Sequence, residues 1–174
     1  MFKEINTLKL FLNDPTREYN VREVARLLKM SPATASNKLK SFFKEGFLQM
    51  RKERILDLYK ADIDSEKFRD LKIFYNIRNL KESGLIESLN EFYLKPVIVL
   101  FGSASFGMDI KDSDFDLLVV SEKISEFKGL KKFENKLKRN LQIFNVKKIK
   151  DLKNENLINN VVNGISLQGK LKWI

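Results

Sequence analysis

The sequence predicts an α+β protein in two parts. The first is a group of helices that ends in a hairpin, and the second is a mixed sheet flanked by helices. Apolar residues recur at helical spacing through most of the first 45 residues. Two later apolar runs, Val97–Phe101 and Leu117–Val120, are too short for helices and are typical of buried strands. With 174 residues, the chain is long enough for two small domains.

Capping residues predict where the helices of the first part begin and end. Asn20 precedes an apolar segment and has Glu23 three residues later, which is a capping box, and Ser31-Pro32 is a second start signal. Gly46 ends the helix that follows. The expected helices are 2–13, 21–29 and 31–45, and the expected strands are 47–51 and 55–60. A charged turn, Lys52-Glu53-Arg54, separates the two strands.

This order of elements, and the segment 31–48 above all, resembles a winged helix-turn-helix of bacterial and archaeal regulators. The resemblance implies a domain at 1–62 whose third helix turns Ala35, Leu39 and Phe42 inward, with Val24, Leu27 and Leu28 behind them. It also implies contacts to double-stranded DNA from the third helix and the hairpin. The residues expected to make them are Thr34, Ser36, Asn37, Lys40, Arg51, Lys52 and Arg54. A dimerisation or protein-docking module, or a plain solvated helix face, is the alternative.

A helical connector is expected at 63–92. Apolar residues at helical spacing run from Phe68 to Leu80, Ser83-Gly84 is the expected break, and a second stripe follows it. This segment is interpreted either as a dimer seam or as an ordinary packing helix.

The segment 97–120 contains the residues with the clearest chemistry. It is predicted to form a strand, a turn at Gly102-Ser103, a loop and a second strand that opens with Asp114 and Asp116. Alternate residues of a strand point the same way, so the two carboxylates lie side by side. Adjacent carboxylates repel each other unless a cation lies between them, and Mg²⁺ prefers such oxygen ligands together with substrate phosphates. The Gly-Ser turn offers backbone N–H groups and a hydroxyl to a phosphate.

The spacing of Gly102-Ser103 and Asp114-Phe115-Asp116 resembles the signature of the nucleotidyltransferase superfamily that includes DNA polymerase beta, and its minimal branch in particular. Gly107 and Ser113 also fit that pattern, and the resemblance covers about residues 93–169. It implies a nucleotidyltransferase domain at 93–174 that uses Mg²⁺ or Mn²⁺ and takes ATP or another nucleoside triphosphate. The implied catalytic and metal residues are Asp114 and Asp116, and the implied nucleotide-binding residues are Gly102, Ser103 and Ser113.

The third carboxylate of that family is missing from its expected place. It normally stands on the strand after the next helix, which here is the predicted strand 141–146. Gln142 occupies the matching position, and a neutral amide can neither act as a base nor bind a metal strongly. Two hypotheses follow: a slow enzyme, or a domain that binds nucleotide without reacting.

The remaining elements of the second part are a helix at 124–140, a helix at 154–163 and a short strand at 165–167. Residues 123–153 carry 11 Lys/Arg and 3 Asp/Glu, a net charge of +8. This basic stretch is interpreted either as a surface for triphosphate or nucleic acid or as a solvated helix face in a lysine-rich chain.

Residue types that are absent exclude several classes of enzyme. The chain has no histidine and no cysteine, so Ser-His-Asp triads, Cys-His pairs, disulfides and the common zinc sites are impossible. The net charge of +10 favours an anionic partner, although residues 1–62 and the remainder each carry +5. No apolar run is long enough for a membrane span, and no secretion signal begins the chain. We therefore expect a cytoplasmic protein without a membrane partner.

Two functions are consistent with these patterns. In the first, the protein transfers a nucleoside monophosphate from a nucleoside triphosphate to a hydroxyl, with a partner protein as one candidate acceptor. In the second, it is a DNA-binding transcriptional regulator, with a homodimer as the usual form, and its second domain only binds nucleotide or dimerises.

Overall fold

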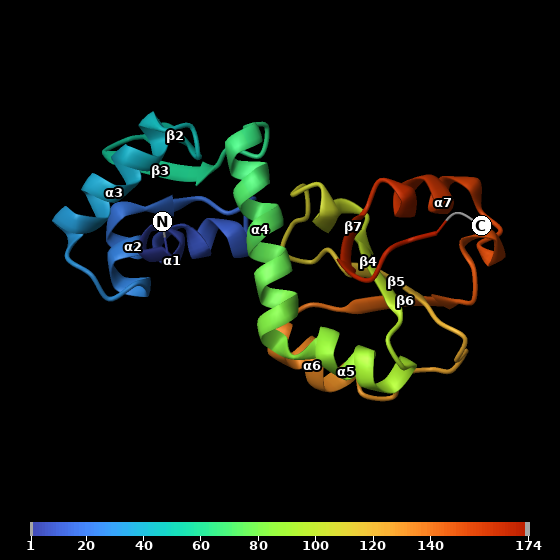
Figure 1. Ribbon diagram of the computed structural model, residues 1–174. Helices are drawn as coiled ribbons and strands as arrows, with labels where there is room; N and C mark the ends of the chain where they lie inside the picture. The colour runs from blue at the N-terminus through green and yellow to red at the C-terminus, as the bar shows by residue number, and fades with distance from the viewer. Residues whose placement is uncertain (1, 173–174) are drawn as a thin grey trace. The chain divides into compact units, whose positions relative to one another are not determined.

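A computed structural model describes the backbone of residues 2–172 and the side chains of residues 6–172. The chain forms two compact units, residues 1–72 and residues 73–174, and each is described by itself (Figure 1). Both combine helices with a sheet, which confirms the α+β fold class. Within the described residues, no helix has the length and apolar content needed to cross a membrane.

The first unit contains three helices and a three-stranded antiparallel sheet. The helices are α1 (Phe2–Asn13), α2 (Val21–Leu27) and α3 (Pro32–Lys44), and the strands are β1 (Tyr19–Asn20), β2 (Leu48–Glu53) and β3 (Leu56–Ala61). The strand order is β1-β3-β2. The predicted caps are confirmed: Asn20 Oδ1 accepts from Glu23 N at 2.9 Å, and Ser31 Oγ accepts from Thr34 N at 3.1 Å. The two-residue strand β1 had no signal in the sequence.

The core of the first unit confirms most of the predicted inward positions. Ala35, Leu39 and Phe42 are buried on one face of α3, and Val24 is buried on α2. The prediction that Leu27 lies in the core was wrong, because this residue is 45% exposed. The buried face of α2 is set by Val24 and Ala25, and two residues further along a helix correspond to a rotation of about 200°. Leu27 therefore points to the opposite side from Ala25.

Two helices occupy most of the predicted connector. They are α4 (Glu66–Ser83) and α5 (Leu85–Tyr93), and the division between the two units falls within α4. Gly84 lies between them with a φ of 83°, a left-handed conformation that glycine adopts without a steric penalty. The predicted break at Ser83-Gly84 is therefore confirmed.

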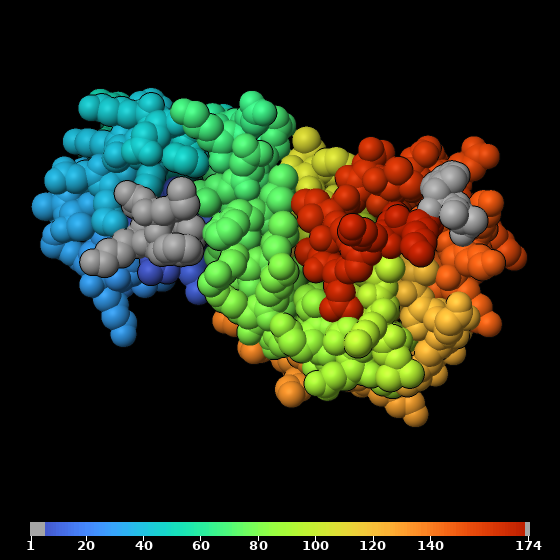
Figure 2. Space-filling model, viewed as in Figure 1, coloured from blue at the N-terminus to red at the C-terminus, as the bar shows by residue number. Residues whose placement is uncertain are grey.

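The second unit is built on a four-stranded mixed sheet. Its strands are β4 (Val97–Phe101), β5 (Phe115–Val120), β6 (Leu141–Val146) and β7 (Ile165–Gln168), in the order β6-β5-β4-β7. β4 is antiparallel to both of its neighbours, whereas β5 and β6 are parallel. β7 is one edge of the sheet, and Figure 2 shows it among the red atoms on the surface of this unit.

The two faces of this sheet are covered by different helices (Figure 1). One face packs Leu100, Phe115 and Leu117 against α5 and α6 (Leu130–Leu137), and Leu89 and Phe133 are among the residues that meet them. The other face packs its buried residues against α7 (Glu155–Val162) and the short helix η2 (Ile149–Asp151). That second core consists of Val99, Phe101, Leu118, Ile149, Leu152 and Val161.

The helix predicted at 124–140 was too long, since α6 begins only at Leu130. Hydrogen bonds to side chains already fix the backbone of the residues that precede α6. Tyr93 Oη donates to Ser125 O at 2.7 Å, Ser125 N donates to Asn145 Oδ1 at 3.1 Å, and Lys123 N donates to Ser121 Oγ at 2.9 Å. Side-chain bonds of this kind compete with helix formation, because they take the same backbone groups. The apolar pattern alone did not reveal this competition.

Candidate active site

The start of β5 places two carboxylates on one face of the sheet. Phe115, between them, is buried in the core on the α5 and α6 side. Asp116 is in register with Phe101 of β4, which belongs to the core on the α7 side. Alternate residues share a face, so Asp116 lies away from Phe115, and the same alternation places Asp114, which stands one residue before β5 begins. Both aspartates are half-buried, which leaves them accessible to a ligand.

Gly102 brings the turn after β4 directly against Asp116. It has a φ of 71°, and a Cβ added to it would lie 2.3 Å from Asp116 Oδ2. Such a contact is far inside van der Waals range, so only a residue without a side chain allows this approach. Gly102, which the sequence predicted in a phosphate-binding turn, therefore meets the carboxylate that the sequence predicted as a metal ligand.

The turn itself is a single short helical turn, η1 (Ser103–Ser105). Ser105 closes it, since its N and its Oγ both donate to Gly102 O, at 3.1 and 2.7 Å. The first N–H groups of a helical turn, here those of Ser103 and Ala104, have no acceptor within the turn. Ser113, which the sequence assigned to nucleotide binding, has a structural role in the loop. Its Oγ accepts a hydrogen bond from Ile110 N at 2.9 Å.

Burial and a like charge act together on Asp116. Removal from water, and then the negative charge of Asp114, raise the pKa of Asp116, while the positive charge of Arg139 opposes them. A carboxylate that is costly to ionise gains from a bound cation. The pair therefore fits a divalent metal ion such as Mg²⁺, which is commonly held by one or two carboxylates together with substrate phosphates.

Asp116→Asn is expected to raise the melting temperature of the metal-free protein at neutral pH by about 2 °C. The folded state holds the Asp116 proton above the ordinary pKa of 3.8, so stability from this group falls as pH rises. The amide removes that loss, and solvent screening keeps the gain small because the side chain is only half-buried. Thermal unfolding in chelator checks this. Below pH 3.8 the two proteins should melt alike, and a gain that persists there would contradict the explanation.

Gln142 stands beside Asp116 on the next strand. The two residues are in register in the parallel β5–β6 pair, so their side chains share the face that carries the carboxylates. This is the position that the sequence assigned to the missing third acid. Among the described residues, no group of three or more acidic side chains is arranged to hold a metal ion. The site thus offers two carboxylates and one neutral amide.

Gly102→Ala is expected to destabilise the protein by roughly 1–3 kcal/mol and to abolish metal binding. The added Cβ meets both an unfavourable φ and the Asp116 carboxylate. Gly84→Ala is the matched control, because Gly84 has a φ of 83° and nothing within 4 Å of an added Cβ. Thermal unfolding and Mn²⁺ titration would be measured on both variants. If Gly84→Ala weakened Mn²⁺ binding as much as Gly102→Ala, backbone strain alone would explain the loss.

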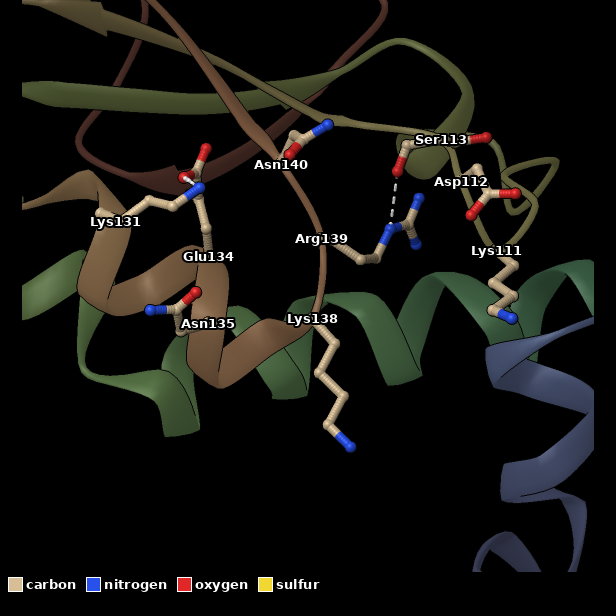
Figure 3. A pocket seen from close by; sticks show the side chains of 9 residues that line it. All are labelled: Lys111, Asp112, Ser113, Lys131, Glu134, Asn135, Lys138, Arg139 and Asn140. Atoms are coloured by element: carbon tan, nitrogen blue, oxygen red, sulfur yellow. Dashed lines mark hydrogen bonds and ion pairs between the residues drawn. The ribbon is translucent and has the colours of Figure 1, made fainter.

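A pocket of about 400 Å³ lies next to this site (Figure 3). Ser113 and Arg139 line it, but neither Asp114 nor Asp116 does. Figure 3 shows Lys131 turned toward Glu134, with which it forms an ion pair of 3.3 Å, and Lys138 pointing away from Arg139. The basic residues of the predicted stretch 123–153 that line this pocket therefore do not converge on one point.

Three residues that hold the loop were missed in the sequence. Asn76, Asp109 and Arg139 come from α4, from the loop and from the segment between α6 and β6, and they bond to one another inside the protein. A buried ion pair between positions 30 residues apart has no signature in a single sequence.

The predicted DNA-binding residues of α3 lie on its outer side. Thr34, Asn37 and Lys40 are exposed, and Ser36 is partly buried. Thr34 Oγ1 lies 2.8 Å from Ser31 Oγ, so it takes part in capping the helix. These four residues lie between Thr34 and Lys40, in the middle part of α3.

The basic residues of the hairpin differ in how strongly nearby carboxylates offset their charge. Arg51 donates to both carboxylate oxygens of Glu18, at 2.7 and 2.6 Å, and lies 2.7 Å from Glu53 Oε2. The hydrogen bond from Arg51 lowers the pKa of Glu18. Two carboxylates therefore offset the charge of Arg51, whereas Lys52 and Arg54 are exposed at the end of the hairpin.

Comparison with known proteins supports the interpretation of the second unit. Residues 82–163 match the nucleotidyltransferase domain family. The matched range contains β4, the Gly102 turn, both aspartates and β6, so it includes the whole site described above. No match was found among curated proteins.

One solved structure is similar over part of the chain. It is titled "Possible transcriptional regulator from Methanosarcina mazei Go1" and is 21% identical, with a TM-score of 0.36. The similarity covers 53% of this chain and 78% of that one. At this level of similarity, the site of the present chain has to be interpreted from its own residues.

Proposed function

We propose that the protein transfers a nucleoside monophosphate from Mg-ATP, or another nucleoside triphosphate, to a hydroxyl acceptor. The observation that carries this proposal is the packing of Gly102 against Asp116, with Asp114 on the same face. It joins a phosphate-binding turn to a carboxylate pair, and the family match at 82–163 supports it. A partner protein is one candidate for the acceptor.

The chain's own residues would have three tasks. Asp114 and Asp116 would hold Mg²⁺, which supplies positive charge to the phosphates and lowers the barrier to displacement. Ser103 and the N–H groups of its turn would bind the phosphate tail and orient the α-phosphorus. The acceptor oxygen would then form a bond to that phosphorus as the bond to pyrophosphate breaks.

The acceptor's proton would pass to solvent in this protein. The residue in register with Asp116 is Gln142, whose amide is not a base. General-base help is typically worth about 10²–10⁴-fold in rate, so we propose a slow transferase.

Incubation with labelled nucleotides tests this proposal. The purified protein would be mixed with Mg²⁺ and each of the four α-³²P-labelled nucleoside triphosphates, with and without proteins encoded beside its gene. Label that appears on an acceptor, with release of pyrophosphate, is the expected result. Nucleotide that binds under these conditions and is never transferred would reject transferase activity.

A second function is favoured by Gln142. A neutral residue at the third-acid position suits a domain that binds nucleotide without turnover. In this alternative, the protein is a transcriptional regulator. We propose that residues 1–62 form a winged helix-turn-helix for double-stranded DNA, that 63–92 connect it to the nucleotidyltransferase domain at 93–174, and that a homodimer binds paired half-sites. The exposed polar residues on α3 support this proposal.

Lys40→Ala is expected to weaken DNA binding at every sequence and to reduce the salt dependence by about one phosphate contact. Arg51→Ala is expected to have a smaller effect, because Glu18 and Glu53 already bind that guanidinium. Fluorescence anisotropy at several salt concentrations, with Asn37→Ala included for base reading, would measure both effects. Equal losses for Lys40→Ala and Arg51→Ala would show that DNA displaces the two glutamates.

A further inference from the structure

A buried polar cluster holds the loop between Gly102 and Asp114. We call it the loop clamp, and it consists of Asn76, Asp109 and Arg139. The Asp109 side chain is fully buried and that of Arg139 is 11% exposed. The loop clamp lies inside the second unit. None of its three residues is among those that the family resemblance assigns to the site.

Asn76 fixes the first half of the loop to α4. Its Nδ2 donates to Asp109 Oδ1 at 2.7 Å and to Ala104 O at 3.1 Å. Ala104 lies in the turn that follows Gly102, so one amide group ties the phosphate-binding turn and the middle of the loop to the same point of the helix.

Arg139 fixes the second half of the loop. Its Nη1 pairs with Asp109 Oδ2, and its Nε donates to Ser113 O at 2.7 Å. Its guanidinium also lies 4.3 Å from the centre of the Phe115 ring. Arg139 therefore contacts the residue before Asp114 and the residue after it.

A buried ion pair indicates a role other than stability, because its net contribution to the free energy of unfolding is small. Burial removes two charges from water, and well-packed apolar residues often serve stability equally well. The planar guanidinium fork, however, defines two directions at once, which an apolar contact does not.

We propose that the loop clamp positions the turn at Gly102 and the carboxylates at Asp114 and Asp116 for metal and triphosphate, with Arg139 as the main positioning residue. This inference rests on the proposed metal site. It predicts that the clamp controls metal affinity beyond its contribution to folding, as outer partners of metal ligands commonly do.

The test compares clamp variants with a matched control on the same helix. Asn76→Ala removes both donors to the loop, and Arg139→Lys keeps the charge but loses the fork. Ser83→Ala is the control, because Ser83 is buried on α4, donates to Leu80 O at 2.7 Å and does not contact the loop. Thermal unfolding would establish that each variant folds, and Mn²⁺ affinity would be measured by electron paramagnetic resonance.

A second readout does not depend on metal. Ile110 N donates to Ser113 Oγ at 2.9 Å, so hydrogen exchange at the Ile110 amide reports on the loop next to Asp114. The clamp variants are expected to speed this exchange, while Ser83→Ala leaves it unchanged. Such a difference separates loosening of the loop from a general loss of stability.

The expected result is that Asn76→Ala and Arg139→Lys weaken Mn²⁺ binding by about 10- to 100-fold, with Ser83→Ala close to the original protein. Unchanged Mn²⁺ affinity in folded clamp variants, or unchanged exchange at Ile110, would overturn the positioning role alone. If the original protein binds no Mn²⁺, the metal site of the proposed function fails, and the clamp proposal fails with it.

Discussion

Replacing Asp114 and Asp116 together by asparagine is expected to lower nucleotidyl transfer by at least about 10³-fold. Asp116 lies directly against Gly102, and the charge of Asp114 acts on Asp116. Without them, no negative charge holds the metal, and the loss of one preorganised electrostatic contact alone typically costs about 10²–10³-fold. Asparagine keeps the shape, so folding should be preserved.

The rate of label transfer and the Mn²⁺ affinity would be measured for this double variant, with Asp112→Asn as the control. Asp112 lies two residues before Asp114 but is exposed and lines the neighbouring pocket, so its change should leave both values intact. DNA affinity should also be unaffected. Transfer that survives in the double variant would exclude these aspartates as the metal site.

Gln142→Asp is expected to raise the transfer rate by about 10²-fold. The register of β5 and β6 puts the new carboxylate beside Asp116 and on the same face. It would add a third metal ligand and a group able to accept the proton of the acceptor hydroxyl. In the absence of metal, the same change should destabilise the protein, because like charges on neighbouring strands repel each other.

Gln142→Asn is the matched control, since asparagine has the length of aspartate without its charge. Single-turnover transfer and thermal unfolding with and without Mg²⁺ would separate charge from shape. Equal rates for the Asp and Asn variants would show that a third carboxylate at this position does not assist the reaction. A gain in Mn²⁺ affinity without any transfer would favour the regulator.

The site was predictable from sequence to the extent that it depends on local periodicity. Asp114 and Asp116 share a face because strands alternate, and the same alternation aligned Gln142 with them on the parallel strand. The close approach of Gly102 to Asp116 was not predictable in detail. It depends on how the turn after β4 folds back over β5, which involves residues far apart in the chain.

The features that sequence analysis missed depend on long-range contacts. The helix expected from residue 124 begins at Leu130, because Tyr93 and Asn145 bind the backbone of Ser125. The sequence did not single out Asp109, which is buried and bonds to Asn76 and Arg139. Periodicity describes a segment's own faces, whereas these interactions are decided by partners that the segment meets after folding.

The place of β6 at the free edge of the sheet has a consequence for how such a protein changes over generations. Gln142 is exposed there, so residue 142 can vary with little effect on the core. Neutral residues at this position are exchanged without a large penalty in folding, whereas a carboxylate there depends on a bound metal to offset its repulsion from Asp116. Under the proposed function, substitutions at residue 142 would therefore change the chemistry of the site and leave the architecture of the sheet intact.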